Sequence, residues 1–170
     1  SLVARAWVHL EPDMEFRCFV AGGCVTGISQ YRHFIYFPRV VALHSQIQAG
    51  IVDFIDNTIQ PRLAGTFPDD NYVADLAVEL LGGDVSNILL EELSPCVSLG
   101  RWWCIEINPF FETTDGALFS WRMDRDLLEG ERDGAALEFR FNSHSQKGGL
   151  ANFGDQWKSA VEGLITARRK

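Results

Sequence analysis

The chain has 170 residues, 46% of them hydrophobic and 22% charged, which is the composition of a globular domain with one sizeable core. Its formal net charge of −8 argues against a general surface for nucleic acid or anionic membranes, because binding phosphates requires clustered Lys and Arg. No signal-peptide pattern is visible, and no hydrophobic run reaches the roughly 18 residues of a transmembrane helix. We therefore expect a cytoplasmic protein without nucleic-acid or membrane partners.

The N-terminal part of the chain has the pattern of β-strands. β-Branched and aromatic residues predict a strand over residues 2–8. Residues 14–20 alternate in polarity and predict a second strand, with Arg17 on its more polar face. The Gly22-Gly23 pair then predicts a hairpin turn into a third strand over residues 24–30.

The pattern changes to that of a helix and then returns to that of a strand. Between residues 39 and 59, hydrophobic residues recur at three- and four-residue steps, which predicts an amphipathic helix that ends before Pro61. Residues 71–80 predict a strand that carries Asp75 in an otherwise hydrophobic run. A carboxylate there must reach solvent, pair or bind a cation, because burying it alone is costly. Residues 81–100 are predicted to form an inserted connection.

The next predicted strand, residues 101–107, delivers an acid and an amide. Glu106 and Asn108 are two residues apart, so their side chains point to the same face, and the chain breaks at Pro109. Oxygen donors of this kind suit Mg²⁺, although many such pairs simply face solvent. If this strand pairs with the one before it, Asp75 lies near both residues.

The C-terminal third is expected to complete a single lobe over residues 1–170. Residues 115–121 are predicted to form a loop and a hydrophobic, helix-compatible piece, and residues 136–141 a strand. Residues 142–154 read as a linker. Residues 155–170 predict a final helix with Asp155 as its N-cap.

Taken in order, four segments of the chain resemble the cell division cycle protein 123 family. They are residues 14–20 (MEFRCFV), 27–31 (GISQY), 105–110 (IEINPF) and 114–121 (TDGALFSW). The resemblance implies an α+β fold, namely the ATP-grasp-like C-terminal lobe, with a mostly antiparallel sheet and packed helices. The family consists of eukaryotic cytosolic proteins that help to assemble translation initiation factor 2, and the resemblance implies the same role for this chain.

The resemblance implies ATP and Mg²⁺ as cofactors. Asp75, Glu106 and Asn108 match the family's magnesium ligands, one acid on one strand and an acid-x-Asn element on the next. The family usually has Asp at the position of Glu106, and the wider ATP-grasp pattern accepts Glu. Arg17 matches an arginine expected to contact phosphate, for which a forked guanidinium is well suited.

The resemblance also places the segment of Arg5 and Trp7 at the link between two lobes, where adenine contacts the backbone. Ala6 stands where family members often have a lysine. The N-terminal lobe that precedes this link in the family is absent from the chain. We therefore expect either a piece of a longer protein or a reduced member that binds nucleotide poorly.

Three functions remain open from the sequence. The first is an ATP-dependent assembly factor that binds the gamma subunit of translation initiation factor 2, as the resemblance implies. The second is an interaction module that keeps the fold and has lost the nucleotide. The third is an ATP-grasp ligase that joins a carboxylate to an amine, although no residue marks an acceptor pocket.

Overall fold

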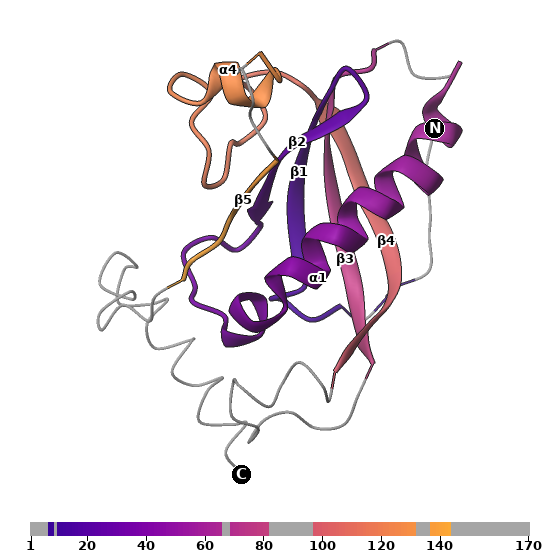
Figure 1. Cartoon of the computed structure of the whole chain (residues 1–170), viewed down its shortest axis with the longest axis vertical. Coiled ribbons are helices and arrows are strands. Elements are labelled where there is room, and N and C mark those ends of the chain that lie inside the picture. Colours follow the sequence, from indigo (N-terminus) through magenta and orange to yellow (C-terminus); the bar gives the residue numbers. More distant parts are fainter. Residues whose placement is uncertain (1–6, 9, 66–68, 82–96, 132–136, 144–170) are drawn as a thin grey trace.

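Five strands form one sheet in the order β4-β3-β1-β2-β5, with a long helix across one face (Figure 1). The computed structural model describes residues 7, 8, 10–65, 69–81, 97–131 and 137–143. The strands are β1 Glu15–Ala21, β2 Cys24–Gln30, β3 Tyr72–Leu81, β4 Ser98–Pro109 and β5 Glu138–Arg140, and the helices are α1 Pro38–Phe54, η1 Ile55–Ile59, α2 Gln60–Leu63 and α4 Arg125–Leu128. All strand pairs are antiparallel except β2 with β5. The predicted α+β class with a mostly antiparallel sheet is confirmed.

The hairpin of β1 and β2 sets the two faces of the sheet. Gly22 and Gly23 have φ angles of 55° and 75°, which is the left-handed backbone that a tight hairpin turn requires. Along β1, Phe16 and Cys18 point to the face that α1 covers, whereas Phe19 belongs to a second hydrophobic cluster on the opposite face. The alternation predicted for this strand is confirmed.

The main core lies between the sheet and α1. The helix contributes a stripe of fully buried side chains, namely Val40, Leu43, Ile47 and Ile51, and Ile55 continues it in η1. Trp102 of β4 packs against the helix at Gly50, where a Cβ atom would lie 2.5 Å from the indole. Glycine therefore lets the edge strand approach the helix closely.

The helix does not end before Pro61, contrary to the sequence prediction. A π-helical turn, η1, follows α1, and the backbone N–H of Gln60 donates to the carbonyl of Ile55, five residues back. Pro61 then lies in the first turn of α2, where a helix does not need the N–H group that proline lacks. The wider turn thus lets the helix continue to Leu63.

Other predicted segments differ from the structure or lie outside it. In the predicted first strand, residues 7 and 8 have no strand structure and residues 2–6 lie outside the described residues. β4 begins at Ser98, so the end of the predicted 81–100 connection is strand instead. Most of that connection, the linker beyond residue 143 and the C-terminal helix also lie outside the described residues.

The segment after β4 folds as successive turns, not as the helix-compatible piece predicted for residues 115–121. Its short helix, α4, begins only at Arg125. A reason is visible at Ala117, which has a φ of 52°, because a left-handed residue interrupts a right-handed helix. None of the helices in the described part of the chain is long and hydrophobic enough to cross a membrane.

Candidate functional site

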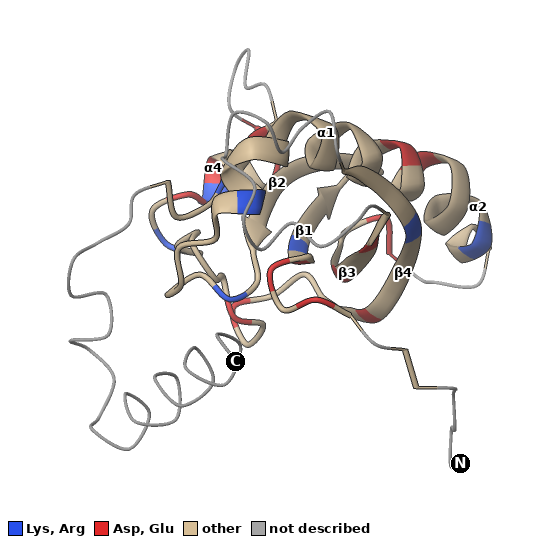
Figure 2. Cartoon of the chain, turned by 90° about the horizontal axis from the view of Figure 1, so that it is seen from below, with Lys and Arg blue, Asp and Glu red and all other residues tan. Residues whose placement is uncertain are grey.

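A row of charged residues crosses the sheet face that α1 leaves open. In the strand register, Glu106 of β4 stands opposite Asp75 of β3, and Asp75 stands opposite Arg17 of β1. Directly opposed residues project to the same face of a sheet. Figure 2 shows acidic positions of β3 and β4 beside a basic position of β1, with α1 on the other side of the sheet. The structure therefore brings together residues separated by up to 89 positions in sequence.

The centre of this row is a buried ion pair. Arg17 Nε donates to Asp75 Oδ1 at 2.8 Å, and Nη2 donates to Oδ2 at 2.8 Å. Arg17 is 7% exposed and Asp75 1% exposed. The hydrogen bonds to Asp75 raise the pKa of the guanidinium, which outweighs the opposite effect of burial. Two-pronged, charge-assisted contacts of this kind are among the strongest in proteins.

The predicted magnesium ligands lie on neighbouring strands. The side-chain amide of Asn108 donates to Asp75 Oδ2 at 3.2 Å, and Glu106 is solvent-exposed. The register between β3 and β4 shifts after Asp75, since Leu76 pairs with Cys104. This bulge adds one residue to β4 next to the point where Glu106 stands opposite Asp75. The prediction that Asp75 lies near Glu106 and Asn108 is confirmed.

The donor chemistry of these three residues fits a hard cation. Two carboxylates and one amide carbonyl are oxygen ligands of the type that Mg²⁺ takes, with phosphates and water completing its shell. The described residues contain no group of three or more His, Cys, Asp and Glu that could hold a metal ion. Magnesium ligation itself stays a prediction.

Tyr31 and Glu15 extend the site beyond the residues that sequence reasoning named. The guanidinium of Arg17 stacks over the Tyr31 ring at 5.1 Å from its centroid. Burial and the nearby charge of Asp75 raise the pKa of Tyr31. Burial also raises the pKa of Glu15, and the charge of Arg32 only partly offsets this. Tyr31 was visible in the GISQY segment, but its contact with Arg17 depends on the β1–β2 pairing.

The loop between β4 and α4, residues 110–124, closes one side of the row. Arg17 Nη1 donates to the backbone carbonyl of Asp115 at 2.7 Å, so the ion pair is tied to this loop. The indole N–H of Trp121 donates to the Thr114 carbonyl at 2.6 Å. The ring of Phe19 packs edge-on against Trp121, at 5.5 Å between centroids, and anchors the loop to the sheet.

A second arginine lies in the same row and was missed by the sequence analysis. Ser29 pairs with both Arg17 and Arg140, so Arg140 lies two strands from Arg17. Arg140 donates to Asp124 through two nitrogens at 2.7 and 2.8 Å and lies 4.2 Å from the centre of the Phe119 ring. The hydrogen bonds to Asp124 raise the pKa of the Arg140 guanidinium. These contacts assign Arg140 to holding the loop.

Gly116 gives a test of how closely the loop is packed. A Cβ atom there would clash with the backbone carbonyl of Phe119. We expect Gly116→Ala to lower the free energy of unfolding by about 1–3 kcal/mol, measured by urea denaturation, because backbone must move to admit the methyl group. Ala117→Gly is the matched neighbour and should not destabilise, since glycine adopts the φ of 52° without strain. Equal losses in both variants would contradict this packing argument.

The sequence analysis also predicted Arg5 and Trp7 at an adenine site. Trp7 has no strand structure and is 93% exposed, and Arg5 lies outside the described residues. Their predicted role at an adenine site therefore stays a prediction.

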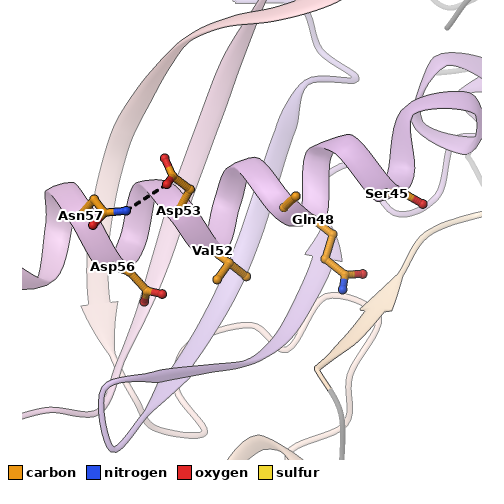
Figure 3. Close-up of a pocket in the computed structure, with 7 residues that line it drawn as sticks. Ser45, Gln48, Val52, Asp53, Asp56 and Asn57 are labelled. Carbon is orange, nitrogen blue, oxygen red and sulfur yellow. Dashed lines mark hydrogen bonds between the residues drawn. The ribbon is translucent and has the colours of Figure 1, made fainter.

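An open hollow of about 510 Å³ lies on the outward face of α1 and η1 (Figure 3). Its lining includes Gln48, Asp53, Asp56 and Asn57, and the Asn57 amide donates to Asp53 at 2.9 Å. A helix that buries its other side against a sheet normally exposes polar residues in this way. We assign the hollow to the solvated surface of the helix.

The fold and the row together define an α+β lobe with one sheet face closed by a helix and the other bearing paired acids and an arginine. The D123 family model matches residues 1–160, and the chain belongs to this family. This confirms the resemblance found in the sequence.

Relatives with established names agree with this assignment. The chain is 34% identical over 121 residues to cell division cycle protein 123 of Eremothecium gossypii, covering 71% of this chain and 28% of the relative. It is 33% identical over 130 residues to the translation initiation factor eIF2 assembly protein of Xenopus laevis, covering 76% of this chain and 32% of the relative. The chain thus spans about a third of the length of these relatives.

The structure of Cdc123 from Schizosaccharomyces pombe has the same fold over most of the chain. It matches with a TM-score of 0.54 and 24% sequence identity, covering 80% of this chain and 44% of that one. The match confirms the predicted fold class.

Proposed function

We propose that this chain supplies the magnesium ligands and a phosphate contact for Mg-ATP in an assembly factor for translation initiation factor 2. The observation that carries the proposal is the row Glu106–Asp75–Arg17 across three adjacent strands, with Asn108 beside it. Anionic and cationic groups next to each other are what a metal–polyphosphate complex requires of its binding surface.

Each residue has a chemical role in this proposal. Asp75, Glu106 and the carbonyl oxygen of Asn108 hold the cation, whose charge offsets that of the phosphates and of the two acids. Arg17 donates to phosphate oxygens. The backbone of the segment with Arg5 and Trp7 contacts adenine.

Family membership supports the proposed partner. The Xenopus laevis relative is named an eIF2 assembly protein, and we extend this role to the present chain. We further propose that the chain binds the gamma subunit of this factor and does so in the cytoplasm. A preceding lobe would complete the nucleotide site. The activity proposed here is binding and assembly.

ATP titration by calorimetry, with and without Mg²⁺, tests the nucleotide site. We expect magnesium-dependent binding that Glu106→Gln weakens by at least about tenfold, because one charged ligand becomes neutral. The control is Glu112→Gln, since Glu112 is exposed on the loop and pairs with Arg125 instead. Coprecipitation of the isolated gamma subunit, with and without Mg-ATP, tests the partner.

One observation favours the alternative of an interaction module without nucleotide. Arg17 and Asp75 satisfy each other's charges without any ligand. If the unaltered chain binds the gamma subunit and gives no heat with Mg-ATP, this alternative replaces the proposal. If it binds Mg-ATP and turns over candidate carboxylate and amine acceptors, the ligase reading replaces it.

A further inference from the structure

The three predicted cation ligands differ sharply in accessibility. Glu106 is exposed and Asn108 half-buried, whereas the Asp75 side chain is only 2% exposed. Both Asp75 oxygens accept hydrogen bonds from Arg17, and Oδ2 also accepts one from Asn108. Solvent therefore reaches Glu106 directly and hardly reaches Asp75.

From this arrangement we infer that, before any ligand binds, the Arg17 guanidinium occupies the position on the Asp75 carboxylate that the cation would take. Metal and nucleotide then bind together, and the metal does not bind first. The inference rests on the proposed function and adds the order of binding to it. Its basis is that a second positive charge at the same carboxylate would be repelled by the guanidinium within hydrogen-bonding distance of it.

Arg17 is held in this place by contacts outside the pair. Nη1 donates to the Asp115 carbonyl at 2.7 Å, and Tyr31 lies under the guanidinium plane. These contacts fix the side chain from two sides, so a metal ion alone has to displace a well-anchored arginine. Only a ligand that offers the guanidinium a new anion compensates for the lost contact with Asp75.

A polyphosphate supplies that anion. Arg17 exchanges one charge-assisted contact, to Asp75, for another, to phosphate oxygens, and Asp75 becomes accessible in the same event. The affinities for metal and nucleotide are then coupled, and the coupling is the same in both directions. The inference predicts weak binding of metal alone and strong cooperativity with ATP.

The test is binding of Mn²⁺, as a spectroscopic substitute for Mg²⁺, followed by electron paramagnetic resonance of the free ion on the full chain. Arg17→Met should bind Mn²⁺ alone about 10-fold or more tighter than the unaltered chain, within the usual range of coupling between sites. The same variant should bind Mn-ATP more weakly. A variant that merely destabilises the fold is not expected to bind Mn²⁺ more tightly and Mn-ATP more weakly at the same time.

Matched variants locate the effect. Arg17→Met with Glu106→Gln should lose the gain, because the second carboxylate is gone. The melting temperature of Arg17→Met should rise with added Mn²⁺, because the cation replaces the missing partner of Asp75, and Arg17→Met with Asp75→Asn should show no such rise. If Arg17→Met does not fold, Arg17→Gln is measured in the same way, since its neutral amide still donates to Asp75.

Unchanged Mn²⁺ affinity in the folded Arg17 variants would overturn the inference, even if the unaltered chain binds Mn-ATP as proposed. Conversely, tighter Mn²⁺ binding by the variants together with no Mn-ATP binding by the unaltered chain would overturn the proposed nucleotide function and the joint binding of metal and nucleotide. It would support only the part of the inference in which Arg17 occupies the place of the cation. The two failures are therefore distinguishable.

Discussion

Asp75→Ala is expected to lower the free energy of unfolding by roughly 3–5 kcal/mol, the usual cost of removing one partner from a buried ion pair. The substitution leaves the Arg17 guanidinium, whose side chain is 9% exposed, without its carboxylate. The Asn108 amide also loses its acceptor. Urea denaturation followed by circular dichroism measures the loss, and the same protein should show no magnesium-dependent ATP binding.

Glu106→Ala is the control that separates stability from binding. Glu106 lies in the same row but is exposed, so its removal should change the free energy of unfolding by no more than about 0.5 kcal/mol. It should nevertheless weaken Mg-ATP binding. If both variants destabilise the protein equally, Asp75 has no special structural role and the buried pair does not stabilise the sheet as described.

Much of this site could be predicted from sequence because it depends on local rules. Asp75 stood out as a charge within a hydrophobic strand, and the spacing of Glu106 and Asn108 placed both on one face. Pairing of β3 with β4 follows when consecutive strands are neighbours, which is the common arrangement. The Gly22-Gly23 hairpin is local in the same sense.

The parts that could not be predicted depend on pairings between distant segments. β1 lies beside β3, so the contact of Arg17 with Asp75 spans 58 residues and depends on one register out of several. Arg140 enters the row only because β5 pairs in parallel with β2. The continuation of the helix through Pro61 required a π turn, which hydrophobic periodicity alone does not reveal.

Phe19 and Phe16 occupy opposite faces of β1 and allow the loop to be tested separately from the main core. Phe19→Ala should lower the free energy of unfolding by about 3–5 kcal/mol, because a fully buried ring leaves a cavity. The cavity opens against Phe119 and Trp121, whose centroids lie 5.3 and 5.5 Å from that of Phe19. The loop that holds the Asp115 carbonyl against Arg17 therefore loses its anchor.

Phe16→Ala should cost a similar amount, since Phe16 is also fully buried, but its cavity opens on the α1 side. Hydrogen exchange resolves the two cases. Residues 110–121 should exchange faster in Phe19→Ala than in Phe16→Ala at matched global stability, because only the first releases the loop locally. Equal exchange of these residues in both variants would mean that the loop is held by its own turns and by Arg140, and that the Phe19 cluster does not position the carbonyl that fixes Arg17.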